Sequence, residues 1–253
     1  MRDSTPPLLV EFVGLPGVGK STLAAGLVEV LRDDGVKVWT PVSNVNNVES
    51  HIHRVPRKAT YVARYLLCRP TVAAGWLRTF QQNPNASAHD VVRTGFNWLF
   101  VAGALRSRRI SNGVTVADQG LFQAYWSAVL GDPNPPAYSV HRVMETELSE
   151  ARLVVILVEA DPDVVRRRLA ARADNPSRVS ADADVETGSE SGMLEDEGYS
   201  LEQAWTAYEH VADSLAALEG RYPSLSVVRC RNDEVDDIRR NVTAIRDTLS
   251  GDR

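Results

Sequence analysis

The residues with the clearest chemical meaning form a glycine-rich stretch near the amino end. Residues 14–22 read GLPGVGKST, and the first eight of them fit the pattern G-x-x-x-x-G-K-[ST]. An apolar run precedes the stretch and helix-forming residues follow it, which is the context that this pattern requires. The glycines let the backbone turn its N–H groups inward, and the following helix adds the positive end of its dipole. The stretch, here called the phosphate loop, therefore predicts a site for nucleotide phosphates.

Two side chains of the phosphate loop predict a nucleoside triphosphate bound together with magnesium. Lys20 has the reach to contact the β- and γ-phosphates, and the Ser21 hydroxyl is placed to ligate Mg²⁺. ATP and Mg²⁺ are therefore the expected cofactors. The residues that this pattern predicts to hold the nucleotide are Gly14, Gly17, Val18, Gly19, Lys20 and Ser21.

Asp118 is the second candidate for chemistry, because it ends the apolar run VTVAD. A carboxylate at that point can hold magnesium together with Ser21, or accept the proton of a substrate hydroxyl. The competing interpretation is a helix N-cap, and both roles can coexist. The next residue is Gln119, where an ATP-driven motor usually has a water-activating Glu, and the sequence lacks the guanine-reading Asn-Lys-x-Asp of GTPases. These features favour a kinase over a hydrolase or a switch.

A cluster of arginines further along the chain supports a kinase. Phosphoryl transfer needs cations on the oxygens of the transferred group, and arginines on a closing lid supply them only when substrate is bound. Arg168 and Arg172 are four residues apart and share a helix face, and Arg178 follows them. We therefore predict these three as catalytic cations, alongside Lys20 and Asp118. The competing interpretation is a solvated basic face paired with neighbouring carboxylates.

Five apolar runs alternate with helical patterns, which predicts an α/β fold with a doubly wound, five-stranded parallel sheet flanked by helices. Ligands of such folds bind beyond the carboxyl ends of the strands, where the phosphate loop, Asp118 and the arginines all fall. The runs are LLVEFV at 8–13, VKVWTPV at 36–42, GVTVAD at 113–118, ARLVVILVEA at 151–160 and LSVVRC at 225–230. The second strand is expected to halt near Pro41.

The organisation predicted along the chain is a single domain over 1–253. Residues 42–110 are expected to form a helical acceptor-site region, with breaks at Pro70, at 81–87 and at His89. Residues 173–199 are polar, acidic and rich in Ser, Gly and Asp, which predicts a mobile lid. In the helical region, Trp98 either stacks on an acceptor or belongs to the core. After the last predicted strand, Asn232 either borders the adenine of ATP or caps a loop.

The bulk properties set limits on partners. A net charge of −5 in 253 residues disfavours nucleic acid as a partner, although a local basic patch leaves that open. No run approaches the ~20 apolar residues of a membrane span, so we expect a cytoplasmic protein without a membrane partner. Cys68 and Cys230 are each predicted to be a buried free thiol. The expected partner is a small-molecule acceptor, and a homodimer is left open.

The chain resembles the P-loop nucleoside and nucleotide kinase superfamily and, within it, the thymidylate kinase-like group. The resemblance rests on EFVGLPGVGKSTLA, LFVAGALRSRRISNG, VTVADQG and VVILVEADPDVVRRRLAAR, in that order. It implies transfer of phosphate from ATP–Mg²⁺ to a small hydroxyl or phosphate acceptor. It also implies that Thr22 completes the phosphate loop, that Asp118 matches the acid of the family's Asp-Arg pair, and that Arg168 and Arg172 match lid arginines. Gln119 departs from this pattern, because the family usually has Arg there to touch the acceptor.

Three functions remain open on sequence alone. The first is a kinase that transfers the γ-phosphate of ATP to a nucleoside, a nucleotide or another hydroxylated metabolite, with a hydroxylated base in DNA as a variant. The second is a nucleotide-binding regulatory module without turnover. Gln119 and the acidic lid support this possibility. The third is a water-activating ATPase, which the missing Glu at position 119 weakens.

Overall fold

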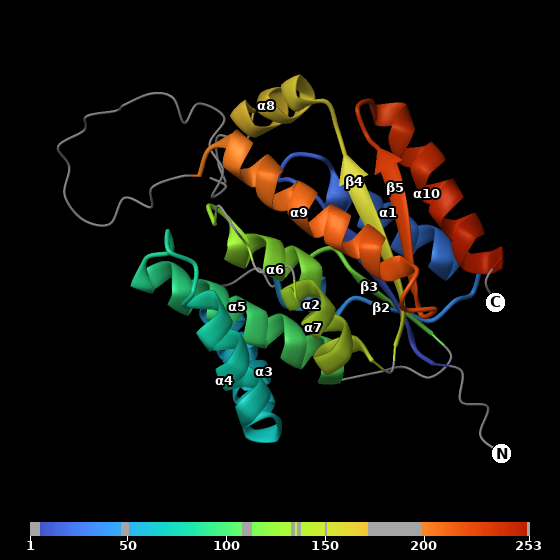
Figure 1. Ribbon diagram of the computed structural model, residues 1–253. Coiled ribbons are helices and arrows are strands. Elements are labelled where there is room, and N and C mark those ends of the chain that lie inside the picture. Colours follow the sequence, from blue (N-terminus) through green and yellow to red (C-terminus); the bar gives the residue numbers. More distant parts are fainter. Residues whose placement is uncertain are drawn as a thin grey trace, which may run out of the picture.

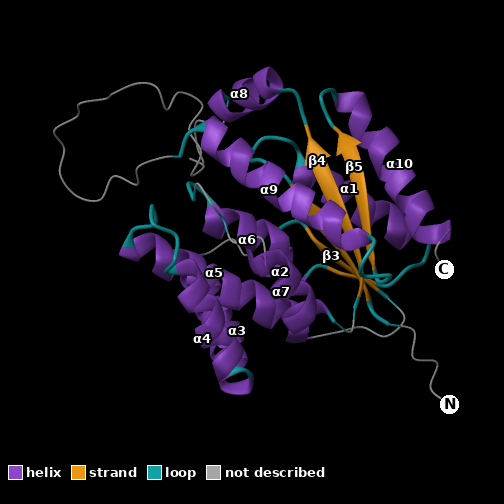
Figure 2. Ribbon diagram, viewed as in Figure 1, coloured by secondary structure: helices purple, strands orange, loops and turns teal. Residues whose placement is uncertain are grey.

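The computed structural model describes residues 6–46, 51–107, 113–132, 135, 138–149, 151–171 and 199–251. Its centre is a parallel sheet in the order β2-β3-β1-β4-β5 (Figures 1 and 2). The predicted five-stranded parallel sheet is thereby confirmed. The strands are β1 Leu8–Val13, β2 Val38–Trp39, β3 Val114–Ala117, β4 Arg152–Glu159 and β5 Leu225–Arg231.

Two helical layers cover the sheet, which explains why its central strands are largely buried. Helices α1 (Lys20–Asp33) and α10 (Val235–Gly251) pack against each other on one face. Helices α6 (Leu121–Val129) and α9 (Leu201–Glu219) cover the other face (Figure 1). Every residue of β1 is buried as a result. Helix α8 (Pro162–Ala170) lies at the carboxyl edge of the sheet, with Asp161 as its N-cap.

Strand β2 ends before Pro41, as predicted, and covers the middle of the run at 36–42. Only Val38 and Trp39 pair with β3, and helix α2 (Pro41–Asn46) begins directly afterwards. The physical reason is Pro41, which has no N–H for a sheet ladder and is well suited to the first position of a helix. The shorter strand places Thr40 and α2 at the carboxyl edge, beside the end of β3.

The region expected to be helical contains α3 (His51–Cys68), α4 (Pro70–Phe80) and α5 (Ala88–Ser107), so the predicted breaks at Pro70 and at 81–87 are confirmed. The third predicted break, at His89, falls one residue inside α5. Its core is aromatic. The rings of Trp76 and Trp98 lie 4.4 Å apart between centroids, and Phe80 lies 5.5 Å from Trp98. Trp98 is fully buried, which identifies it as a core residue and not as a platform for an acceptor.

Helix α7 (Tyr138–Val143) continues into a π-helical turn, η1 (Met144–Leu148), neither of which the sequence analysis predicted. This turn carries the buried carboxylate of Glu147. Tyr65 of α3 donates a hydrogen bond of 2.5 Å to its Oε1. Arg69 and Arg106 approach its Oε2 at 3.8 Å each, so Glu147 joins α3 and α5 to η1.

The two cysteines differ from each other. Cys230 is buried, as predicted, whereas the prediction for Cys68 is wrong because this residue is exposed. The reason is its position as the last residue of α3, next to Leu67, which is also exposed. Among the described residues, no helix combines the length and the hydropathy needed to cross a bilayer.

Candidate active site

The phosphate loop leaves the carboxyl end of β1 in a conformation that demands glycine. Gly17 and Gly19 have φ angles of +91° and +94°, which side chains rarely tolerate. Space is also restricted on both sides of the loop. A Cβ added at Gly14 would collide with the backbone oxygen of Val158, and one at Gly19 would collide with the amide of Asn232. The loop is therefore enclosed by β4 and by the turn after β5.

Lys20 is folded back onto the phosphate loop. Its Nζ donates to the carbonyl oxygens of Gly14 and Leu15, at 2.7 and 2.8 Å. The ammonium is thereby held over the start of the loop. An incoming phosphate offers this cation an anion in place of two neutral carbonyls, which adds the attraction between opposite charges.

The first residue of the loop is anchored by a side chain that the pattern does not reveal. Gly14 donates its N–H to Oε1 of Gln123 at 3.0 Å, and Gln123 is buried in the first turn of α6. Because this N–H is already paired, Gly14 supplies the tight turn of the loop and does not supply a phosphate donor in this arrangement.

Asn232 supports the middle of the loop from beneath. Its Nδ2 donates to the carbonyl oxygen of Val18 at 2.6 Å, and its backbone N–H donates to the carbonyl oxygen of Glu159 at 2.8 Å. The residue is buried, so its amide holds the loop backbone in the described structure. Its predicted place beside adenine therefore stays a prediction, and the contact with Val18 is what the structure adds.

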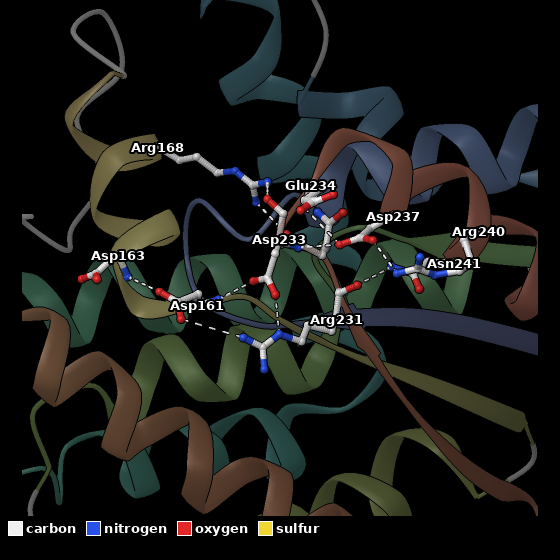
Figure 3. Close-up of polar contacts among 10 residues, drawn as sticks. Asp161, Asp163, Arg168, Arg231, Asp233, Glu234, Asp237, Arg240 and Asn241 are labelled. Carbon is white, nitrogen blue, oxygen red and sulfur yellow. Dashed lines mark hydrogen bonds and ion pairs between the residues drawn. The ribbon is translucent and has the colours of Figure 1, made fainter.

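Arg168 lies across three backbone segments, as Figure 3 shows in part. Its Nη1 donates to the carbonyl oxygen of Asn232 and its Nη2 to that of Asp233, at 2.9 Å each. A longer contact of 3.4 Å reaches the carbonyl oxygen of Gly17 in the phosphate loop. The guanidinium predicted as a catalytic cation thus joins α8, the β5–α10 turn and the loop.

Carboxylates fix the β5–α10 turn on which Asn232 sits (Figure 3). Asp233 accepts from the Arg231 guanidinium and from the N–H of Asp161. Asp237 accepts from the N–H groups of Asp233 and Glu234, at 2.9 and 3.0 Å. The hydrogen bond from Arg231 lowers the pKa of Asp233, and that from the Glu234 N–H lowers the pKa of Asp237. Both carboxylates are therefore ionised acceptors at neutral pH.

Asp118 follows β3 and lies at an open cleft of about 480 Å³ that Ser21 also lines. The Ser43 hydroxyl of α2 donates to Oδ1 of Asp118 at 2.7 Å, which orients the carboxylate. One side of the cleft carries Thr40, Ser43 and Asn44, and α1 forms the other side. A serine hydroxyl and a carboxylate are hard oxygen donors, so this pair has the chemistry that suits Mg²⁺.

Asp118 does not cap the next helix. The N-cap of α6 is Gly120, which has no side chain to accept hydrogen bonds from the first turn of the helix. The side chain that accepts hydrogen bonds from the first turn of α6 is that of Glu11, in the middle of β1. Its Oε2 accepts from the N–H of Leu121 at 3.0 Å, and its Oε1 accepts from the N–H of Gln123 at 2.9 Å. The N-cap interpretation of Asp118 is therefore wrong, which leaves its carboxylate to the cleft.

Glu11 is the functional candidate that the sequence analysis missed. It is fully buried, and burial raises the pKa of its carboxyl from 4.5 to about 7, against the backbone N–H groups that lower it. Gly120 has no room for a side chain, because a Cβ there would collide with this carboxyl group. The available signal was the charge itself, since Glu11 interrupts the apolar run LLVEFV.

Part of the predicted site lies outside the described residues. This applies to Arg172, to Arg178 and to all of the predicted lid except Tyr199. Their predicted roles stay predictions.

Comparison with known proteins assigns the chain to a family. Residues 9–188, more than half of the chain, match a family model described as an AAA domain. No curated protein matches the chain.

Three of the solved structures that match show deoxyadenosine kinase from M. mycoides. The complex with dCTP is 12% identical over 96% of this chain and 99% of that chain, with a TM-score of 0.43. The complex with the products dCMP and a flexible dCDP is 12% identical over 97% and 100%, with a TM-score of 0.47. The complex with dATP is 14% identical over 96% and 99%, with a TM-score of 0.42.

Proposed function

The chain belongs to the AAA domain family, and we propose that it is an ATP-dependent kinase that transfers the γ-phosphate to a hydroxyl group of a small acceptor. The observation that carries the proposal is the shared cleft. Ser21, at the end of the phosphate loop, and Asp118, at the end of β3, line the same open space at the carboxyl edge of the sheet. This arrangement supports a triphosphate and an acceptor side by side.

In the proposed mechanism, Lys20 leaves the carbonyls of Gly14 and Leu15 and binds the phosphates of ATP. Ser21 and Asp118 would hold Mg²⁺, which when bound neutralises charge on the phosphate oxygens. Asp118, kept in one orientation by Ser43, accepts the hydrogen bond of the acceptor hydroxyl and orients it toward the γ-phosphate. Arg172 and Arg178 are proposed to approach the transferred group from the lid.

The walls of the cleft favour a neutral hydroxylated acceptor over a phosphorylated one. Thr40, Ser43 and Asn44 offer two hydroxyls and an amide, which pair well with the hydroxyl groups of a ligand. Among the described residues that line the cleft, Arg32 is the one cation, and it lies near the far end of α1. Gln119 adds no positive charge after Asp118. The thymidylate kinase-like group stays a prediction, since that resemblance includes an Arg at this position.

A phosphoryl-transfer screen tests the proposal. The protein is incubated with γ-labelled ATP and Mg²⁺ against separate pools of nucleosides, nucleotides, sugars, aminocyclitols and duplex DNA. The controls are Lys20→Ala, which removes the phosphate cation, and Asp118→Asn, which keeps the shape but removes the carboxylate. We expect a labelled small acceptor with the native protein and a loss of label with both variants.

Other outcomes of this screen would overturn the proposal. Labelled inorganic phosphate, formed at the same rate with and without every pool, would indicate a water-activating ATPase. ATP binding without labelled product of any kind would indicate a regulatory module. A label on duplex DNA alone would replace the small acceptor by a nucleic acid.

A further inference from the structure

Glu11 has no part in the mechanism just proposed, although it lies beside the site. A charged side chain in the centre of a parallel sheet is unusual, because a buried charge is unfavourable unless it is well paired. Its neighbours in register are Ala117 of β3 and Val155 of β4, which offer it nothing polar from their side chains. Its partners are backbone N–H groups at the start of α6.

A short series of hydrogen bonds leads from Glu11 to the phosphate loop. Gln123 donates its backbone N–H to Oε1 of Glu11, and the side-chain Oε1 of the same Gln123 accepts from the N–H of Gly14. Gln123 therefore links the two: its backbone binds the Glu11 carboxylate, and its side chain binds the first residue of the loop. Gly14 is in turn one of the two carbonyl acceptors of Lys20.

Glu11 also contacts the turn that follows Asp118. Gly120, two residues after Asp118, packs so closely on the Glu11 carboxyl group that no Cβ fits between them. The turn from β3 into α6 is thus in close contact with this carboxyl group. The same buried side chain therefore contacts both the turn that follows Asp118 and Gln123, the residue that anchors the phosphate loop.

We propose that Glu11 is a positioning residue of the nucleotide site: its ionised carboxylate fixes the first turn of α6 and, through Gln123, holds the phosphate loop in the form that binds nucleotide. The proposal rests on the nucleotide-binding part of the proposed function and not on phosphoryl transfer.

The protonation state matters because a carboxylate only accepts hydrogen bonds, whereas a carboxylic acid turns one oxygen into a donor. A donor facing the N–H groups of Leu121 or Gln123 would loosen the first turn of α6. Burial raises the pKa of Glu11 to about 7, so both forms are populated near neutral pH.

No charged neighbour competes for this titration among the described residues. The ionisable groups of the strands beside Glu11 are Asp118, just after β3, and Arg152 and Glu159, at the two ends of β4. Helix α6 carries no Asp, Glu, Lys, Arg or His, and its titratable side chain is the buried phenol of Tyr125. The causes that shift the pKa of Glu11 are burial and backbone N–H groups, without a contribution from any of these charges.

Calorimetric titration with ATP in excess Mg²⁺, between pH 6 and pH 8, tests the proposal. If only the ionised form binds well, a pKa of about 7 predicts affinity about tenfold weaker at pH 6 than at pH 8. Binding near pH 7 should also release protons, seen as a dependence of the heat on the buffer. We expect Glu11→Gln to bind more weakly at pH 8 than the native protein does and to lose both effects.

Two further variants separate positioning from stability. Gln123→Met removes the acceptor of the Gly14 N–H but keeps the backbone contact with Glu11, so we expect weaker binding and a smaller pH effect. This variant also keeps the test decisive if Glu11→Gln does not fold. Glu147→Gln alters another buried carboxyl, remote from the loop in its contacts, and should retain the tenfold pH effect.

The opposite outcomes would overturn the proposal. Affinity that does not change with pH, or that falls as the pH rises, would show that Glu11 is structural or that its charge repels the nucleotide. Retention of the native pH effect in Glu11→Gln would assign it to another group. A protein with the expected pH-dependent binding but no phosphoryl transfer would refute the kinase and leave this role of Glu11 intact.

Discussion

The phosphate loop and the helical region α3–α5 are stabilised in different ways. The loop is held by single hydrogen bonds from side chains far away in sequence: Gln123 on Gly14, Asn232 on Val18 and Arg168 on Gly17. The helical region is held by apolar packing around Trp98 and by the buried Glu147. Side chains at the loop therefore shape a backbone that binds ligand, whereas those in the helical region fill space.

This difference predicts a division between mutations that affect activity and mutations that affect stability. A hydrogen bond to a loop carbonyl contributes about 1 kcal/mol to folding, but it determines where the N–H groups of the loop point. A buried aromatic ring such as that of Trp98 contributes several kcal/mol to folding, and no described contact joins this ring to the loop. Four predictions test this division, from the largest expected effect to the smallest.

Replacing Lys20 by Ala should give the largest effect, and it should affect activity alone. Removing the cation that binds the phosphates is expected to lower the rate of phosphoryl transfer by about 10³-fold, by comparison with the loss of a single electrostatic stabiliser elsewhere. The melting temperature should change little, because the hydrogen bonds from Nζ to Gly14 and Leu15 stay within the loop and do not join it to another element. Steady-state kinetics and calorimetry on one preparation measure both. A large loss of stability would show that the loop needs Lys20 to fold.

Trp98→Ala should show the reverse pattern. Its ring is fully buried between Trp76 and Phe80, so the free energy of unfolding should fall by about 3–5 kcal/mol. Urea denaturation measures this change. The affinity for ATP of the folded fraction should stay within about twofold of the native value, since no described contact joins Trp98 to the loop. A greater loss of affinity would place the helical region in contact with the nucleotide.

Glu11 should combine the two effects in opposite directions. Its carboxylate should favour nucleotide binding and at the same time lower the free energy of unfolding. Its pKa of about 7 in the folded state exceeds the value of 4.5 expected when unfolded, so the folded state binds the proton more tightly. The resulting penalty appears as the pH rises above about 4.5 and is complete above about 7. It amounts to about 3 kcal/mol, since each pKa unit corresponds to about 1.4 kcal/mol.

Urea denaturation of the native protein and of Glu11→Gln, at pH 4.5 and at pH 8, isolates this term. On going to the higher pH, the native protein should lose about 3 kcal/mol of unfolding free energy relative to the variant. An equal change in both proteins would assign the titration to other groups.

Arg168 gives the smallest expected effect and distinguishes two roles. If its guanidinium acts through the carbonyls of Asn232 and Asp233, Arg168→Lys should behave like Arg168→Met, because an ammonium lacks the planar fork that spans both oxygens. Each variant should then weaken ATP affinity by about tenfold with little change in kcat, as expected for about 1.4 kcal/mol. Rescue of kcat by Arg168→Lys would instead support the catalytic cation predicted from sequence.

Local patterns were enough to predict the sheet, the phosphate loop and the breaks between α3, α4 and α5. Each of these depends on residues close together in the chain, such as the glycines at 14–19 or Pro70. The end of β2 just before Pro41 was also predicted, because proline lacks the N–H that a sheet ladder needs. The exposure of Cys68 was missed because it depends on how α3 packs.

The supports of the loop were beyond the reach of pattern reasoning, because each joins distant segments. Gln123 and Asn232 lie 109 and 214 residues from their partners in the loop. Glu11 was different, since a lone charge in a buried strand is visible in the sequence. Its partner was not, because α6 offers backbone N–H groups, which every residue but proline has.

The measurement that tests the central claim most directly is phosphorus NMR of ATP and Mg²⁺ incubated with the protein and the acceptor pools. The kinase predicts a new phosphoester resonance that grows in step with ADP, needs the acceptor and disappears with Lys20→Ala. Growth of inorganic phosphate in step with ADP, without any new phosphoester, would contradict the account.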